Sequence, residues 1–592
     1  MICKSEGNTD FGEGVVSRMI SGALAAVLGV GLLFGAVARG QDAPKDAPAA
    51  EKTAPAEEAA APADAGKPSI DERINDAVAP YTDALSKVVF VSVWEKTVTD
   101  ENGKPVMEEG EGGKMKPKKL DVPFVLLWLA GAAVFFTLFF RFVNIRGFGL
   151  ALRTVRGKYS LPDDPGEITH FQALTSAVSG TVGLGNIAGV AIAISLGGPG
   201  AAFWMVVMGL LGMSTKFVEC TLGVKYRHID KEGKVHGGAM LYLTRGFAER
   251  GMGPLGKTMA VFFGVCCVGA SFGGGNMFQI NQATSQLINV TGGAGGWVDG
   301  NRWVFGVAIA VLVGMVIIGG ISRIGKLTAK LVPAMTVIYI IGCFVVLGTH
   351  IDRVAETFAL IFTHAFTGEA IGGGLVGTLL MGVRRAAFSN EAGIGSAPIA
   401  HAAVKTRYAA SEGLVGLLEP FVDTVIICTM TALVVIVTGD YRDTGMDGVT
   451  ITSHSFTSVM PSFGYVLSAA VILFALSTLI TWSYYGLQAW KFLFGKGRRA
   501  DITFKLIFCG VIIVGAAMSP KKVIDFSDAM LFSMSFANLA GVYVLLPVVR
   551  RELRKFMLFT KRVDSGESID AADAHVRSRF PEPHHGKEHP YG

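Results

Sequence analysis

Two stretches of the sequence place polar side chains and paired glycines among otherwise apolar residues. Residues 179–189 read SGTVGLGNIAG, and residues 388–398 read FSNEAGIGSAP. Glycine loosens a helix and an unpaired polar group is costly in hydrocarbon, so we expect both stretches to interrupt a helix. An interrupted helix offers free N–H groups that attract a carboxylate, and free carbonyl oxygens that suit a hard cation such as Na⁺. The pattern therefore predicts a joint site for a zwitterionic solute and a cation.

Close packing of small residues between helices is the other explanation of these glycines. It accounts for any single glycine, but it does not account for Asn186 or for the run Ser389-Asn390-Glu391. Non-helical backbone at membrane depth is tolerated only where it lines a cavity or is buried in protein. We therefore expect functional breaks at both stretches.

The elements that carry these stretches are apolar enough to cross a membrane. The chain has 592 residues, of which 51% are hydrophobic and 17% charged, and its mean hydropathy is +0.46. Soluble domains contain about 25% charged residues, and about 20 apolar residues cross the hydrocarbon core. We predict an all-α polytopic membrane protein with 11 transmembrane helices, at residues 122–144, 171–196, 199–225, 257–290, 302–321, 327–349, 371–397, 411–438, 463–494, 503–519 and 524–548.

The segment before the first span has the features of an exported leader. Residues 1–38 contain an apolar run that ends in Ala36-Val37-Ala38, which predicts a signal peptide or an uncleaved signal anchor. Residues 39–68 are rich in Ala, Pro, Glu and Lys, as in a disordered extracytoplasmic linker. Residues 69–121 predict an amphipathic helix over 69–94 on the outer membrane face, followed by a charged loop or hairpin.

Basic residues fix the expected orientation. They gather after the first span and in alternate loops from there, and the tail at 550–592 begins Arg550-Arg551. By the positive-inside rule these loops and the tail are cytoplasmic, which places the N-terminus outside the cytoplasm. The resulting location is the inner membrane of a bacterium.

The spans divide into one leading helix and two matching halves. After the span at 122–144, residues 145–349 and 350–549 each hold five spans, and each half opens with one of the interrupted stretches. An odd number of spans per half requires the halves to be inverted in the membrane. Interrupted helices at matching positions of inverted halves are the best sequence pointer to a transporter's binding site.

These residues resemble a known family, the alanine or glycine:cation symporters, also called sodium:alanine symporters. The similarity covers residues 122 to 550 and rests on 178–205, on GGGNMFQINQ at 273–282, on RRAAFSNEAGIGSAPIAHAA at 384–403 and on LFALSTLITWSYYG at 473–486. The resemblance implies a LeuT-like 5+5 inverted-repeat fold with two discontinuous helices. It also implies that Na⁺ drives a small neutral amino acid, alanine or glycine, into the cell by alternating access.

The resemblance also assigns residues to the substrate. The substrate carboxylate is expected at backbone N–H groups near Gly183 to Gly185, with Asn186 beside it, although that amide would also serve to tie two helices together. The polar stripe of the third span and an aromatic cap on a later span are expected to complete the pocket. The predicted substrate-binding residues are Thr181, Gly183, Gly185, Asn186, Asn276, Gln279, Phe388, Ser389, Asn390, Gly393 and Trp482.

A Na⁺ site is implied between the first interrupted span and the span at 463–494. Its expected ligands are the carbonyls of Ser179 and Val182 and the hydroxyls of Ser477 and Thr478. Bonding of those two hydroxyls to their own helix is the competing use. A second, weaker cation candidate comprises Asp423, Thr424 and Thr429.

Three charged positions within the spans suggest local ion pairs. Glu391 is an intramembrane carboxylate with Arg384 or Arg385 as its expected partner, and Lys216 lies three residues from Glu219. If Glu391 were itself the carried group, the transporter would be coupled to H⁺ instead of Na⁺.

Other function classes fit the sequence poorly. It has no HExxH, GxSxG or phosphate-loop motif, so we expect no enzyme and no resident cofactor. A channel would build selectivity from rings or repeated filters, which one chain with asymmetric halves lacks. The expected partners are a small amino acid, Na⁺ and membrane lipid, with no nucleic acid.

Overall fold

A computed structural model describes residues 80, 82–97, 104–105, 107–109, 115–117, 119–293, 295–318, 320–367, 374–442, 446, 448–459 and 463–581. The chain divides into two compact units, residues 1–80 and 81–592, and the first lies almost wholly outside the described residues. The leader expected at 1–38, the linker expected at 39–68 and the first part of the amphipathic segment therefore also lie outside them.

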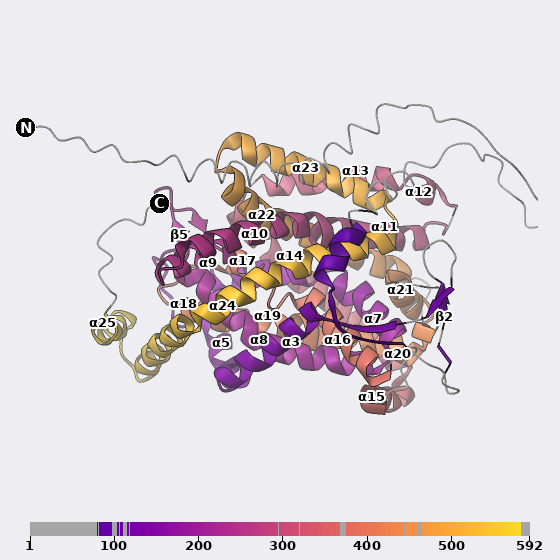
Figure 1. Ribbon diagram of the computed structural model, residues 1–592, viewed down its shortest axis with the longest axis horizontal. Coiled ribbons are helices and arrows are strands. Elements are labelled where there is room, and N and C mark those ends of the chain that lie inside the picture. Colours follow the sequence, from indigo (N-terminus) through magenta and orange to yellow (C-terminus); the bar gives the residue numbers. More distant parts are fainter. Residues whose placement is uncertain are drawn as a thin grey trace, which may run out of the picture. The chain divides into compact units, whose positions relative to one another are not determined.

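The second unit is mostly helical (Figure 1). In chain order its helices are α3 (Phe124–Phe139), α4 (Val143–Arg146), α5 (Phe148–Val155), α6 (His170–Thr181), η1 (Gly185–Gly189), α7 (Val190–Gly197), α8 (Gly200–Lys225), α9 (Ala239–Ala248), α10 (Gly253–Phe272), η2 (Gly273–Met277), α11 (Phe278–Val290), α12 (Trp297–Gly300), α13 (Arg302–Ile317), α14 (Gly320–Thr349), α15 (Ile351–Thr367), α16 (Gly374–Asn390), α17 (Pro398–His401), α18 (Ala409–Gly416), α19 (Leu418–Pro420), η3 (Phe421–Cys428), α20 (Thr429–Thr438), η4 (Asp440–Arg442), α21 (Val449–Thr457), α22 (Phe463–Phe494), α23 (Arg498–Ala517), α24 (Pro520–Asp564) and α25 (Ile569–Arg579).

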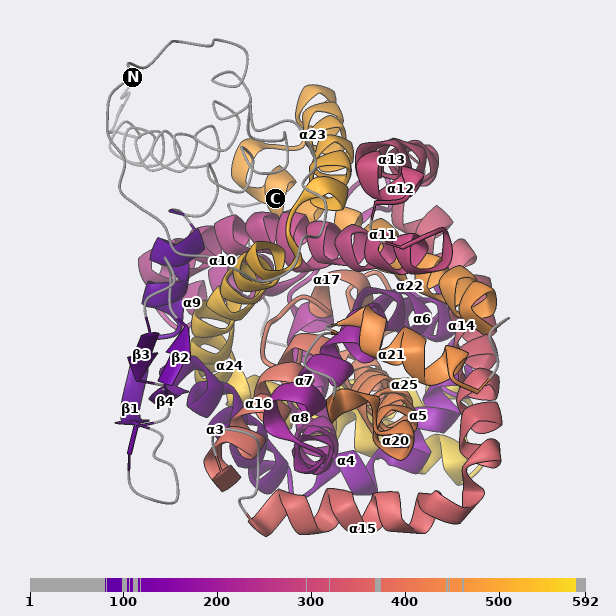
Figure 2. The same ribbon diagram turned by 90° about the vertical axis from the view of Figure 1, so that its right-hand side faces the viewer.

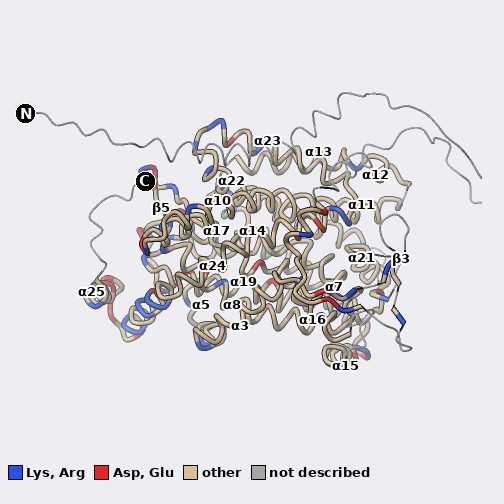
Figure 3. Tube along the Cα trace, viewed as in Figure 1, with Lys and Arg blue, Asp and Glu red and all other residues tan. Residues whose placement is uncertain are grey.

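Seven helical stretches among the described residues are long and apolar enough to cross a membrane, and the bent pair α6 and α7 raises that number to eight. Helices α3 and α13, which fall at two predicted spans, have only 16 residues each. The chain is thus a multi-pass membrane protein, and the total of 11 spans stays a prediction. In Figure 3 the long helices carry few charges along their middles, while basic residues gather at α25 and the adjoining end of α24.

The first interrupted stretch breaks its helix where glycine and asparagine predict it. A capping box at Thr169 and Gln172 starts α6, and α6 ends at Thr181. The chain resumes as η1 at Gly185 and continues into α7, and the two halves are bent by 55°. The three residues between the halves leave the regular helical hydrogen-bond pattern.

The second interrupted stretch also leaves the helix. Helix α16 ends at Asn390, and α17 begins at Pro398. Glu391 has a left-handed backbone with φ of 55°, and Gly393 and Gly395 follow with φ of 94° and 88°. A left-handed conformation in a residue with a side chain is costly and collects at functional sites.

Three π-helical segments interrupt the long helices at polar residues. Segment η1 contains Asn186, η2 contains Asn276, and η3 contains Asp423. Such segments are rare in proteins as a whole, but those that occur often lie at functional sites, because they shift side chains out of the regular helical register.

The interrupted helices lie inside the second unit. Figure 2 shows α6, α7 and α16 surrounded by α10, α11, α14 and α15. Helix α8 packs against α16 and α18, α6 packs against α14 and α22, and α10 packs against α22 and α24. These contacts bury both breaks completely.

A small β-structure precedes α3. Strands β1 (Ser92–Thr97) and β4 (Lys119–Pro123) pair antiparallel, as do β2 (Met107–Glu109) with β3 (Met115–Pro117) and, later in the chain, β5 (His228–Ile229) with β6 (Val235–His236). Residues 82–89 are helical, so the helix expected to reach residue 94 ends earlier and gives way to a strand. Within the tail predicted at 550–592, α24 continues to Asp564 and α25 follows.

Candidate functional site

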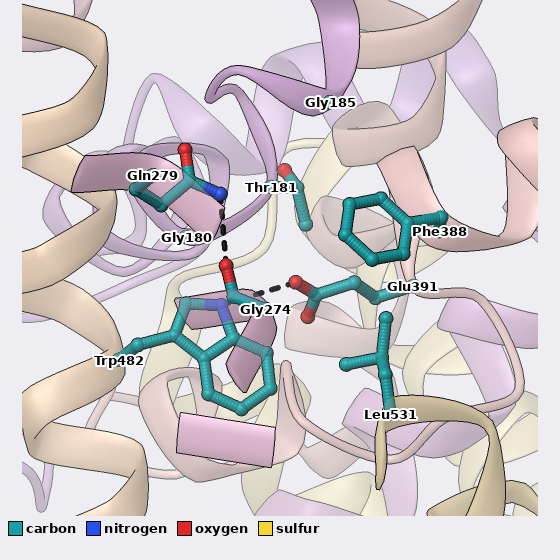
Figure 4. Close-up of a pocket in the computed structure, with 9 residues that line it drawn as sticks. All are labelled: Gly180, Thr181, Gly185, Gly274, Gln279, Phe388, Glu391, Trp482 and Leu531. Carbon is teal, nitrogen blue, oxygen red and sulfur yellow. Dashed lines mark hydrogen bonds between the residues drawn. The ribbon is translucent and has the colours of Figure 1, made fainter. Parts of the chain in front are cut away.

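A small cavity lies between the two breaks (Figure 4). About 260 Å³ of space lies between its lining atoms, and part of that space is open to solvent. Four separate parts of the chain line it: the first break, the η2–α11 segment, the second break and α22, with one contribution from α24. The lining residues are Gly180, Thr181, Gly185, Gly274, Gln279, Phe388, Glu391, Trp482 and Leu531.

Two polar side chains span the cavity from α11 and α22. The Gln279 amide donates from Nε2 to the Gly274 carbonyl at 2.9 Å, and its Oε1 accepts from the Leu184 N–H at 2.9 Å. The Trp482 indole Nε1–H donates to Glu391 Oε1 at 3.2 Å. These bonds fix the orientation of both side chains and tie the first break to α11.

The backbone of the first break has one N–H group left over. The Gly183 N–H donates to Asn186 Oδ1 at 2.9 Å, and the Leu184 N–H is taken by Gln279. Among the described residues the Gly185 N–H has no acceptor, although Gly185 is fully buried and lines the cavity. A buried, unpaired N–H at the start of a helical segment is a ready partner for an anionic oxygen.

Asn186 connects the two breaks through a buried carboxylate. Its Nδ2 donates to Asp423 Oδ1 at 2.6 Å and to Ser389 Oγ at 3.0 Å. Ser389 and Thr424 each donate a hydroxyl hydrogen bond to Asp423 Oδ2 at 2.7 Å. Within the part of the chain that the structure describes, every hydrogen bond to the Asp423 carboxylate thus comes from a neutral donor.

Five of the predicted substrate residues line the cavity, namely Thr181, Gly185, Gln279, Phe388 and Trp482. Gly183, Asn186 and Ser389 do not line it but lie directly behind it. A Cβ at Gly183 would approach Thr478 Oγ1 to 2.5 Å and Gln279 Oε1 to 2.8 Å, so this position packs between two other site residues. These three residues shape the break rather than border the cavity.

Three other predicted residues point elsewhere. Asn276 donates to the Phe508 carbonyl at 2.9 Å and so faces α23, because the π-helical turn η2 rotates it away from Gln279. Asn390 donates to Thr424 Oγ1 at 3.0 Å, and the Gly393 carbonyl accepts from Asn538 at 2.8 Å. We had expected all three to contact the substrate, but none of them belongs to the cavity lining.

Of the two hydroxyls predicted to bind Na⁺, that of Thr478 reaches the first break and that of Ser477 does not. Thr478 Oγ1 donates to the Ser179 carbonyl at 3.1 Å, and Ser179 Oγ donates to the Ser477 carbonyl at 2.8 Å. Ser477 Oγ donates to the Phe474 carbonyl of its own helix at 2.9 Å, which is the competing use noted above. Val182 is fully buried next to this group in sequence.

Both expected local ion pairs are wrong. Arg384 and Arg385 bind Asp528 of α24, at 2.9 and 2.7 Å, instead of Glu391. Lys216 Nζ binds Glu419 Oε1 at 2.9 Å instead of Glu219. In both cases helix packing brings an acidic residue of another helix closer to the basic side chain than the expected partner on the same span.

Four lining residues were absent from the expected substrate site. Gly180 and Gly274 lie within the quoted motifs, and their small size lets Thr481, Tyr485 and Phe388 approach the backbone. Glu391 was expected first as an ion-pair partner, with a direct role in ligand or proton binding as the alternative. Leu531 lies in an ordinary apolar stretch of α24, so no local signal marks it.

Comparisons with known proteins place this geometry in context. A family model described as "Sodium:alanine symporter family" matches residues 115–570. The sodium/alanine symporter AgcS of Methanococcus maripaludis is 39% identical over 439 residues, which cover 73% of this chain and 94% of that protein. The probable sodium/glutamine symporter GlnT of Bacillus subtilis is 32% identical over 435 residues, which cover 73% of this chain and 87% of GlnT. The solved structure of MhsT in complex with L-phenylalanine matches with a TM-score of 0.46 and 14% identity, over 64% of this chain and 88% of MhsT.

Proposed function

Because the chain belongs to the sodium:alanine symporter family, and is therefore a secondary transporter of amino acids, we propose that it couples Na⁺ to the uptake of a small neutral amino acid. The observation that carries this proposal is the unpaired Gly185 N–H, which borders the cavity at the helix break. Transport proceeds by alternating access across the bacterial inner membrane, with alanine and glycine as the substrate class.

The cavity suits a zwitterion with a short side chain. The substrate carboxylate accepts from the Gly185 N–H, and its ammonium faces the Glu391 carboxylate on the opposite wall. Phe388, Trp482 and Leu531 supply apolar walls for the short side chain of such a substrate.

Two groups of oxygens support cation binding. The first lies beside the break and carries no formal charge: Ser179 bonds both Ser477 and Thr478, and we include the nearby Val182 carbonyl in it. The second is centred on the Asp423 carboxylate, which binds Asn186 and Ser389 from the two broken segments. A carboxylate buried among neutral donors is costly unless a cation or proton compensates it, so Asp423 supplies a charge that Na⁺ would neutralise.

The test is uptake of labelled alanine into proteoliposomes that contain the purified protein. An inward Na⁺ gradient is expected to drive saturable accumulation, and replacement of Na⁺ by choline at fixed pH is expected to abolish it. Unlabelled alanine, glycine, serine and glutamine compete in order of their fit to the cavity, while large aromatic amino acids do not compete.

Three outcomes separate the alternatives. Uptake that persists in choline but follows a proton gradient would replace Na⁺ with H⁺ as the coupling ion. Ohmic single-channel current without accumulation would identify a channel. Failure of every amino acid in the panel to compete or accumulate would overturn the proposed substrate class.

A further inference from the structure

Five buried ionisable side chains form a continuous cluster on the side of the breaks away from Asp528. We call them the inner cluster: His170 at the start of α6, His401 at the end of α17, Glu412 in α18, Glu419 in α19 and Lys216 in α8. None of the five is more than 3% exposed. The cluster therefore joins the second half of one broken helix and the first half of the other to α8 and α18.

The hydrogen bonds of the inner cluster run in one line. The Glu412 carboxylate accepts from Nδ1 of both His170 and His401, the latter at 2.6 Å. On its other side, His401 Nε2 lies 3.5 Å from Glu419 Oε2. Glu419 Oε1 in turn accepts from Lys216 Nζ at 2.9 Å.

The position of His401 between two carboxylates requires a second ring proton. A neutral imidazole carries one N–H, and the His401 ring uses it at Nδ1 for Glu412. Its Nε2 lone pair would then face Glu419 Oε2, and both atoms are buried without any hydrogen-bond partner. A proton on His401 Nε2 makes this atom a donor, and Glu419 Oε2 can then accept its hydrogen bond.

The charge balance of the inner cluster leads to the same requirement. Two carboxylates and one ammonium leave one uncompensated negative charge if both imidazoles are neutral, and a net charge at membrane depth is expensive. A proton on His401 makes the cluster neutral.

The groups around the cluster do not supply the missing positive charge. The Cys220 thiol faces His401, and Tyr485 faces Glu419, but neither side chain is a cation. Glu219 and Glu391 are close enough to act electrostatically on Lys216, and charge on either would only add to the negative balance. The Arg227 guanidinium acts on Glu412 from a distance, while its own donors bind backbone carbonyls such as that of Ala402 at 2.8 Å.

We infer that His401 is a proton-binding site that holds the inner halves of the two broken helices together. The bound proton exchanges with the cytoplasm through His170, whose Nε2 lies 3.0 Å from the hydroxyl of the partly exposed Ser160. Loss of this proton leaves two facing acceptors between α17 and α19 and an uncompensated negative charge in the cluster, so transport responds to cytoplasmic pH whichever ion drives it. The transport readout below rests on the proposed function, but the stability readout does not.

The first experiment varies internal pH in proteoliposomes at constant external pH and measures alanine uptake. Wild-type uptake is expected to fall at least tenfold as the internal side becomes alkaline. Glu412→Gln removes one negative charge, so the cluster is neutral without the extra proton and the alkaline loss should disappear. His454→Gln is the matched control, because His454 also bonds a carboxylate, that of Asp440 at 2.8 Å, but its side chain is 55% exposed.

The second experiment measures thermal unfolding of the purified protein from neutral to alkaline pH and needs no transport. The wild type should lose stability as pH rises, because the stabilising proton is bound at low pH and released at high pH. Glu412→Gln and His401→Gln should both lack this alkaline loss, while His454→Gln should keep it. A flat wild-type profile, or variants that follow the wild-type profile, would overturn the inference. Absence of alanine uptake with an intact stability difference would instead count against the proposed function alone.

The segment before the first predicted span contacts two helices beside the cavity. The Phe90 ring lies under the Arg384 guanidinium, 4.7 Å from its centre, and meets Phe532 edge-on at 5.8 Å. Asp83 forms an ion pair with Lys522 at 3.2 Å. Residues 82–90 therefore contact both α16 and α24, the two helices that the Arg384–Asp528 pair joins.

That ion pair closes one side of the cavity. Arg385, which also binds Asp528, stacks on the ring of the lining residue Phe388 at 5.6 Å. Separation of α16 from α24 would open the cavity on this side, which the charge pattern predicts to be extracytoplasmic. Residues 82–97 lie outside the part of the chain that matches the family model.

The geometry points to residues 82–97 as a strap that holds the outer side of the cavity closed. Loss of the Phe90 contact with Arg384 should therefore speed opening towards the outside, by about two- to tenfold from the strength of a cation–π contact. The strap is anchored by strand β1, which pairs with β4 directly before α3.

Alanine counterflow in proteoliposomes tests the strap. Phe90→Ala and Asp83→Asn should each raise the initial exchange rate, whereas Val93→Ala, which alters a β1 side chain that is 61% exposed, should not. Access of a charged thiol reagent to a cysteine introduced at Leu531 should rise in parallel. The proposal would be overturned if Phe90→Ala and Asp83→Asn both had the same exchange rate and the same reagent access as Val93→Ala.

Discussion

Replacement of Asn186 by alanine tests whether the first break depends on one amide. The wild-type side chain accepts from the Gly183 N–H at 2.9 Å and donates to Asp423 Oδ1 at 2.6 Å, and the residue is fully buried. An orphaned buried N–H costs about 1–3 kcal/mol, and a hydrogen bond to a charged group contributes about 1.5–3 kcal/mol. We therefore expect Asn186→Ala to weaken the closed conformation by about 3–5 kcal/mol.

A loss of that size should abolish measurable uptake without preventing membrane insertion. If about 3 kcal/mol falls on the substrate-bound state alone, apparent affinity drops roughly 100-fold. Asn281→Ala is the matched control, because Asn281 is equally buried but donates to the Met518 carbonyl at 2.6 Å, away from both breaks. Uptake of labelled alanine and thermal unfolding should be measured for both variants. Wild-type uptake by Asn186→Ala would refute the reasoning, as would an equal loss of uptake in Asn281→Ala.

Three further substitutions have separate expected outcomes. Gly275→Ala places a Cβ 2.2 Å from Trp482 Cγ, so alanine uptake should fall more than tenfold, whereas Gly348→Ala, with open space around it, should transport normally. Trp482→Phe removes the donor to Glu391 Oε1 and enlarges the cavity, so larger neutral amino acids should begin to inhibit alanine uptake in a competition assay. Asp423→Asn removes the buried negative charge, so the Na⁺ concentration for half-maximal uptake should rise at least tenfold; unchanged Na⁺ dependence would exclude this carboxylate from cation binding.

Local patterns in the sequence were sufficient to place the long helices and the breaks. The apolar run predicted at 199–225 matches α8, and the run predicted at 463–494 matches α22. Paired glycines beside an asparagine located the first break within two or three residues. Hydropathy and glycine content depend only on neighbouring residues, so a single sequence carries both signals.

Partners that meet through packing were not predictable in the same way. Lys216 and Glu419 are 203 positions apart, and Arg385 and Asp528 are 143 apart. Sequence spacing offered only partners on the same predicted span, one to two helical turns away, and these were wrong. The prediction that Asn276 contacts the substrate also assumed a regular helix, which would have placed Asn276 on the same face as Gln279. The π-helical turn η2 instead rotates Asn276 away from the cavity.

The same few residues of the first break serve both proposed ligands, which gives coupling a physical basis. Ser179 contributes the carbonyl oxygen that accepts from Thr478, and Gly185 contributes the free N–H at the cavity, so both depend on α6 ending at Thr181. A cation beside Ser179 and a carboxylate at the Gly185 N–H therefore favour one conformation of the intervening residues. Because the coupling free energy between two binding sites is reciprocal, Na⁺ should tighten amino acid binding by the same factor by which the amino acid tightens Na⁺ binding.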